Sequence, residues 1–161
     1  MRQILKFILL VLITAYTQSG FSQTDKRDFV FKWQNTHDNS WISIDSTLQK
    51  FTPTSEEIKM AKETSIDFID SLERTREPNL VEQYGKILHY RHQSYLRQYL
   101  GYIDNRGNRI VLINACCSAA GEKEDLEHNW IFVLDGGSCY FQIKVDLRTK
   151  KCFDFFVNGE A

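Results

Sequence analysis

Residues 136–147 constrain the fold most strongly, because their apolar side chains alternate with polar ones. Every second position is apolar or carries sulfur, in the set Cys139, Phe141, Ile143, Val145 and Leu147. Successive side chains of a strand point to opposite faces of a sheet, so this period of two predicts a half-buried β-strand. Residues 151–158 place Phe153, Phe155 and Val157 on one side. The two segments together predict a β-hairpin with an aromatic core face.

The segment Asp135-Gly136-Gly137 precedes the first arm of this hairpin. Glycine adopts a positive φ without steric cost, so a Gly-Gly pair after an acidic residue indicates a tight turn. A phosphate-binding loop would need a lysine or the N-terminus of a helix directly after the glycines. Neither follows here, and we interpret the segment as a turn.

The clearest helix begins just after Pro53. Thr54 and Glu57 have the spacing of a capping box, in which the threonine oxygen accepts from a free amide and the glutamate reaches back. The side chains expected on one face of this helix are Ile58, Ala61, Ser65, Ile66, Phe68, Ile69 and Leu72. An apolar stripe of about five turns predicts a helix that lies across a sheet.

The other elements are predicted from short β-branched and aromatic runs between turn residues. Strands are expected at residues 41–45, 96–103, 109–117 and 130–134, with a turn at 104–108 and a surface loop at 118–129. The pattern of residues 80–95 fits either a short helix or an irregular strand. Residues 23–40 are mostly polar, and we expect this N-terminal segment to be poorly ordered.

This order of elements predicts a single α+β domain over residues 41–161. One long helix packed on a curled antiparallel sheet of about four to five strands buries the apolar faces of both. The element order resembles that of cystatin-like and NTF2-like folds, in which a helix lies in the concavity of a bent sheet. Such a resemblance implies a fold and carries no activity with it.

The N-terminus has the features of a secretory signal peptide over residues 1–22. A basic start with Arg2 and Lys6 precedes an apolar run, and small side chains place the cleavage between Ser22 and Gln23. The apolar run is shorter than the roughly 20 residues that span a bilayer. We therefore predict a secreted or periplasmic protein with no membrane span in the mature chain.

The charge of the mature chain argues against nucleic acid as a partner. Cleavage removes two of the 20 basic residues and none of the 21 acidic ones, which leaves 18 against 21 and a net charge of −3. A nucleic-acid-binding protein needs a concentrated basic face. We predict neither a nucleic-acid partner nor a cofactor.

The four cysteines of an exported chain allow three pairings. Strand parity places Cys117 and Cys139 on the core-facing side, within bridging distance if their strands are neighbours. Cys116 and Cys152 are expected on the outer face, two strands and roughly 10 Å apart, which is too far to bridge. We predict a disulfide between Cys117 and Cys139, and buried free thiols are the alternative.

Catalytic and metal-binding chemistry would depend on the histidines. A nucleophilic cysteine, either Cys116 or Cys139, would need a histidine as base. The candidate bases are His89, His92 and His128, and no family signature surrounds any of these residues. His89 and His92 are three positions apart, which suits a metal only on a helix, and no acidic or cysteine ligand is paired with them. We predict no catalytic residue and no metal ligand, and interpret these side chains as solvated.

The outer face of the hairpin carries apolar side chains that the core does not explain. Tyr140 and Phe156 alternate with the core-facing residues of their strands and therefore point to the outer face. Ile110 and Leu112 of another strand are expected beside them. Exposed apolar side chains on one face indicate a contact surface for a protein, peptide or glycan. The alternative is a cover formed by another segment, and the candidates are Trp33, the chain around Tyr90 and residues 130–134.

Four short motifs resemble a group of small exported bacterial proteins of no assigned activity. They are Phe51-Thr52-Pro53-Thr54, Arg97-Gln98-Tyr99-Leu100-Gly101-Tyr102, Asp135-Gly136-Gly137-Ser138-Cys139-Tyr140-Phe141 and Val157-Asn158-Gly159-Glu160-Ala161. The resemblance implies export and supplies no catalytic residues.

The sequence favours a secreted binding or interaction module over an enzyme. A second hypothesis is a small envelope enzyme that uses a cleft between helix and sheet, with His89, His92 or His128 as acid or base. A third hypothesis is a structural accessory of an envelope assembly.

Overall fold

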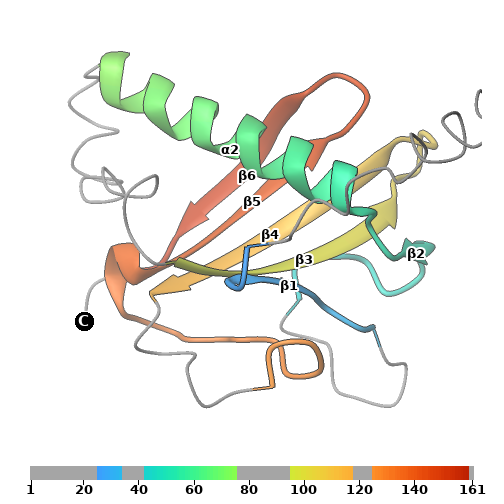
Figure 1. Cartoon of the computed structure of the whole chain (residues 1–161), viewed down its shortest axis with the longest axis horizontal. Helices are drawn as coiled ribbons and strands as arrows, with labels where there is room; N and C mark the ends of the chain where they lie inside the picture. Colours follow the sequence, from blue (N-terminus) through green and yellow to red (C-terminus); the bar gives the residue numbers. More distant parts are fainter. Residues whose placement is uncertain (1–24, 34–41, 76–94, 118–124, 160–161) are drawn as a thin grey trace, which may run out of the picture.

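The computed structural model of the 161-residue chain describes residues 25–33, 42–75, 95–117 and 125–159. Within them, one long helix lies across one face of an open, six-stranded sheet, and irregular segments lie on the other face (Figure 1). The α+β class and the packing of one helix on one sheet are confirmed.

The sheet is mixed, because one edge strand runs parallel to its neighbour. The strands are β1 (Asp28–Val30), β2 (Lys50–Phe51), β3 (Tyr95–Ile103), β4 (Arg109–Cys117), β5 (Tyr140–Asp146) and β6 (Lys151–Val157). Their order is β1-β3-β4-β5-β6, and β2 also pairs with β3. Each pairing is antiparallel except that of β1 with β3. The expected sheet was antiparallel throughout, and β1 is the difference.

The strand predicted at residues 41–45 is wrong. Residues 42–44 form a bend, and β2 pairs with β3 instead. Ile42 is buried against the outer face of the sheet, so its apolar character reflects packing rather than strand pairing. The predictions for residues 80–94 and 118–124 lie outside the described residues.

The helix α2 (Ser55–Thr75) begins at the predicted capping box. The amide of Thr54 donates to Glu57 Oε2 at 2.9 Å, and the amide of Glu57 donates to Thr54 Oγ1 at 3.3 Å. Arg109 of β4 donates to both carboxylate oxygens of Glu57, at 2.8 and 3.0 Å. This bidentate pair fastens the start of the helix to the sheet.

The core lies between α2 and the inner face of the sheet. The helix contributes Ile58, Ala61 and Ile69, and the strands contribute Tyr95, Tyr99, Val111, Ile113, Ala115, Phe141, Ile143 and Val145. The alternation predicted for the first hairpin arm is therefore confirmed. The ring of Phe141 packs edge-on against Tyr95 and Phe155.

The second hairpin arm departs from the predicted alternation. The pairing of β5 with β6 is interrupted between Gln142 and Lys144, and Asp154 has a φ of 48° there. An extra residue in one strand of a pair moves the side chains beyond it to the opposite face.

This bulge exchanges two side chains between the faces. Cys152 points toward α2, where its Sγ donates to the carbonyl oxygen of Thr64 at 3.6 Å, and Phe153 is exposed on the outer face. The predictions that Phe153 points inward and Cys152 outward are wrong. Phe155 and Val157 pack on the helix side as predicted.

The strand β1 lies within residues 23–40, the segment that we expected to be poorly ordered. Its Asp28 carboxylate is buried and accepts from Lys62 Nζ of α2 at 2.8 Å and from Tyr99 Oη at 3.0 Å. Arg97 of β3 lies 3.5 Å from the same carboxylate. Charged partners on two elements thus fix β1 to the sheet.

A disulfide joins Cys117, at the end of β4, to Cys139 in the short 3-10 helix η2 (Gly137–Cys139), as predicted. The bond closes a loop of 22 residues, which stabilises the fold by about 3 kcal/mol in the chain-entropy model. Cys116 and Cys152 are free thiols. Burial raises the pKa of Cys116 to about 11 and that of Cys152 to about 12, which suppresses the reactive thiolate.

Thiol counting tests this arrangement. With the thiol reagent 5,5′-dithiobis(2-nitrobenzoate) at pH 8, the native protein should react slowly, because both free thiols are protonated and at least partly buried. The unfolded, unreduced protein should show two thiols, and the reduced protein four. A count of four without reduction would contradict the disulfide.

Candidate functional site

Irregular segments cover part of the outer face of the sheet. Residues 31–33, 42–48 and 125–135 lie on the side opposite α2 (Figure 1). They bury an outer cluster of Phe31, Ile42, Leu100, Tyr102, Ile110 and Leu112, against which Trp33 and Trp130 pack. The cover that we gave as the alternative is therefore present over Ile110 and Leu112.

Gln98 of β3 is the anchor of residues 125–135, which we call the covering segment. Its buried side-chain Nε2 donates to the carbonyl oxygens of Leu126 at 2.9 Å and Asn129 at 2.6 Å. Its Oε1 accepts from the amide of Ile131 at 2.9 Å and from Asn114 Nδ2 of β4 at 2.9 Å. Every hydrogen-bonding position of the Gln98 amide is thus used.

Residues 130–134 form no strand, so that prediction is wrong. β4 and β5 already have a partner on each side, and the covering segment lies over the sheet rather than within it. Its backbone is satisfied by side chains instead of a ladder: Ile131 donates to Gln98 and accepts from Asn114 Nδ2 at 2.8 Å. A short apolar run has the same sequence pattern whether it forms a strand within a sheet or an extended segment that lies over one.

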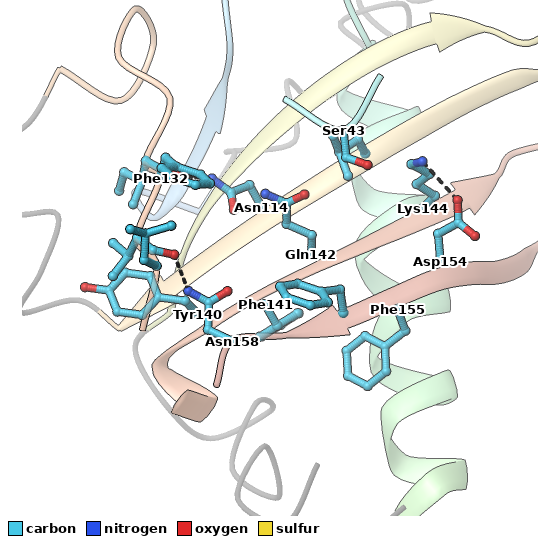
Figure 2. Close-up of a pocket in the computed structure, with 15 residues that line it drawn as sticks. Ser43, Asn114, Phe132, Tyr140, Phe141, Gln142, Lys144, Asp154, Phe155 and Asn158 are labelled. Carbon is cyan, nitrogen blue, oxygen red and sulfur yellow. Dashed lines mark hydrogen bonds and ion pairs between the residues drawn. The ribbon is translucent and has the colours of Figure 1, made fainter. Parts of the chain in front are cut away.

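An open groove of about 480 Å³ lies between the covering segment and the outer sheet face (Figure 2). Ile131, Phe132, Val133 and Leu134 form its wall. Asn158, which follows β6, donates from Nδ2 to the carbonyl oxygens of Val133 at 2.5 Å and Asp135 at 3.0 Å. The wall is therefore held at one end by Asn114 and at the other by Asn158.

Exposed apolar side chains gather at this groove. Four large hydrophobic side chains are exposed in the described part of the chain, and three of them line the groove. They are Phe132, Leu134 and Phe156, with 42%, 83% and 60% of their surface exposed. The fourth, Phe153, also lies on the outer face but does not line the groove. Such a concentration of apolar surface marks a contact site.

The outward side chains of β5 form the floor of the groove. Tyr140, Gln142 and Lys144 are alternate residues of one strand and lie on one face (Figure 2). A Cβ at Gly136 would come within 2.6 Å of the Tyr140 ring, and Gly136 has a φ of 99°, so the predicted glycine turn also makes room for the floor. The side-chain amide of Gln142 makes no hydrogen bond with another described residue.

An ion pair closes one end of the floor. Lys144 Nζ lies 2.9 Å from Asp154 Oδ2, and Lys144 is much the less exposed of the two side chains. Asp154 is the residue in the β-bulge, and bulges re-aim side chains in this way. The two opposite charges leave this end of the groove electrically neutral.

Two of the four predicted contact residues, Tyr140 and Phe156, present accessible surface to the groove. Leu112 lines the groove but is only 1% exposed, and Ile110 lies equally buried beneath the cover outside it, so neither offers a contact surface. The sequence analysis predicted residues 130–134 as a short strand and named them as a candidate cover of this face, but it did not identify Phe132 and Leu134 as exposed wall residues. It also missed Gln98 and Asn114, although a buried amide at an apolar position of a strand signals a polar network.

The candidate histidines do not contribute to the groove in the part of the chain that the structure describes. His128 lies in the covering segment, with Nδ1 2.8 Å from Asp125 Oδ2, and does not line the groove. His89 and His92 lie outside the described residues. Among the described residues, no group of three histidine, cysteine, aspartate or glutamate side chains is arranged to hold a metal ion.

Comparison of the chain with protein-family models, with curated proteins and with solved structures finds no match. Across the described residues, no helix has the length and apolar character needed to cross a membrane.

Substitution of Gln98 tests whether its amide holds the covering segment. Gln98→Leu should lower the free energy of unfolding by about 2 kcal/mol or more, because backbone groups of buried Leu126 and of Asn129 and Ile131 lose their hydrogen-bond partner. Gln142→Leu, the same change on the same face, is the control and should change it by less than about 0.5 kcal/mol. Equal effects in chemical denaturation would contradict the role of Gln98.

Proposed function

We propose that this chain is a non-catalytic binding module and that the groove on the outer sheet face is its ligand site. The observation that carries this proposal is the gathering of Phe132, Leu134 and Phe156 around one open groove. Full burial of a large apolar side chain stabilises a protein by roughly 1.5–3 kcal/mol relative to leaving it exposed to water. A partner that covers these three side chains recovers part of this free energy.

The way the groove is built supports a binding role. Its wall is held at Ile131 and Val133 by side-chain amides that are themselves bonded to protein atoms. The groove therefore exists before a partner arrives, and a preformed site avoids the entropic cost of ordering on binding. Its volume is within the range of about 300–1,000 Å³ that is typical of ligand sites.

The enzyme hypothesis has less support. It requires a cleft between helix and sheet, and the described part of that interface is filled by the core cluster around Phe141 and Tyr99. Its remaining histidines, His89 and His92, are not among the described residues. A structural accessory of an envelope assembly would use the same groove, and stays a prediction.

We further propose that the protein acts outside the cytoplasm, as the predicted signal peptide over residues 1–22, which lies outside the described residues, and the resemblance to small exported bacterial proteins imply. The Cys117–Cys139 disulfide supports this, since disulfides persist in oxidising compartments.

Probe mapping tests the ligand site without knowledge of the partner. Indole added to the isotope-labelled protein should shift the backbone NMR signals of residues that line the groove. The double variant Phe132→Ser/Phe156→Ser should lose at least about 80% of this response, because each serine removes an apolar contact surface. Its melting temperature should fall by only a few degrees, since both side chains are exposed.

Phe153→Ser is the matched control, because it removes an exposed phenylalanine of the same strand that does not line the groove. It should leave the response to indole intact. Shifts centred on α2 or on the edge of β6 that no described strand pairs with, or an equal loss in the control, would contradict the proposal.

A further inference from the structure

We infer that the groove binds an extended peptide segment with uncharged, apolar side chains, whose backbone is recognised by the amide side chains of the groove. This inference rests on the proposed function and names the class of partner. Three features of the lining carry it: aliphatic surface in the wall, the side-chain amides of Gln142, Asn114 and Asn158, and the absence of net charge among the described lining residues.

Three of the four wall residues are aliphatic, and these favour apolar side chains over sugar rings. Leu134 is the most exposed of the large hydrophobic side chains, and Ile131 and Val133 lie beside it. An aliphatic side chain gains free energy by removing another apolar group from water, and it offers nothing to the hydroxyl groups of a glycan. Phe132 and Phe156 add exposed apolar surface to the same lining.

The amide groups match a peptide backbone. Gln142 lies in the middle of the floor with no described partner for either end of its amide, and it offers one acceptor and two donors. Asn114 and Asn158 use their Nδ2 groups to hold the wall, and their Oδ1 atoms accept no hydrogen bond from a described residue. A peptide bond presents the complementary donor and acceptor at each residue.

The charge of the lining selects against charged partners. Lys144 and Asp154 are the only charged residues among the described residues that line the groove, and they neutralise each other at 2.9 Å. An acidic or basic ligand would have to compete with this pair. A neutral partner leaves it undisturbed.

The spacing of the floor fits an extended chain. Tyr140, Gln142 and Lys144 are two residues apart on one strand, which separates them by roughly 7 Å and gives a floor about 14 Å long. An extended peptide repeats its side chains at the same interval, so about four residues cover the floor. The bulge at Asp154 blunts the edge of β6 that no described strand pairs with, which directs the peptide over the face rather than onto the edge.

Gln142→Leu separates a peptide from a purely apolar ligand. The probe is a library of N-acetylated, C-amidated hexapeptides with Leu, Val, Ile or Phe at alternate positions and Ser or Asn between them, read by fluorescence anisotropy. Gln142→Leu should weaken binding at least about fivefold, because hydrogen bonds to the peptide backbone are lost. A ligand held only by apolar contact would bind Gln142→Leu as tightly as the wild type, or more tightly.

Further arms of the experiment identify other occupants. Phe132→Ser/Phe156→Ser should weaken peptide binding at least about tenfold, and Phe153→Ser less than twofold. Chitohexaose, cellohexaose and phosphatidylcholine vesicles are tested in parallel, and sedimentation tests self-association.

The outcomes separate the inference from the proposed function. Peptide binding that is weakened by Gln142→Leu and by Phe132→Ser/Phe156→Ser, but not by Phe153→Ser, supports both the peptide inference and the proposed function. The protein could instead bind an oligosaccharide, vesicles or a second copy of the chain, in a way that depends on Phe132 and Phe156, and bind no peptide. That result would overturn the peptide inference but would still support the groove as the ligand site. Failure of every probe, or binding that is insensitive to these two residues, overturns both.

Discussion

The buried amide of Gln98 is the interaction on which the outer half of the molecule depends. It satisfies backbone groups of the covering segment at Leu126, Asn129 and Ile131, and it orients Asn114, which binds the same segment. A segment laid over a sheet cannot use strand ladders for its backbone, so side-chain amides replace them. A polar network of this kind fixes one position of the segment, because each displaced group would remain buried without a partner.

The two faces of the sheet therefore have different roles. On the inner face, α2 packs directly on the strands and fills the space with apolar side chains. On the outer face, the wall of the groove is suspended between Asn114 and Asn158, and its side chains do not close onto the floor. Part of the outer face is also closed by the buried cluster beneath the cover, and the groove is the part that stays open to a partner.

Much of the packing between α2 and the inner face of the sheet was predictable from the sequence, because it follows from local periodicity. The alternation in β5 and the positions of Cys117 and Cys139 in their strands indicate which face a side chain occupies, and the capping box at Thr54 indicates where the helix begins. The bulge at Asp154 was not predictable in the same way, since one inserted residue reverses parity without changing composition. The groove wall was assigned to a strand because an apolar run does not reveal whether its backbone pairs with strands or with side chains.

The most direct test is the measurement of intermolecular nuclear Overhauser effects between one bound apolar hexapeptide and the isotope-labelled protein. The binding account predicts contacts from peptide methyl groups to Phe132, Leu134 and Phe156, and from peptide amides to the side-chain amide of Gln142. Contacts confined to α2 or to the backbone edge of β6, with none to these four residues, would contradict it.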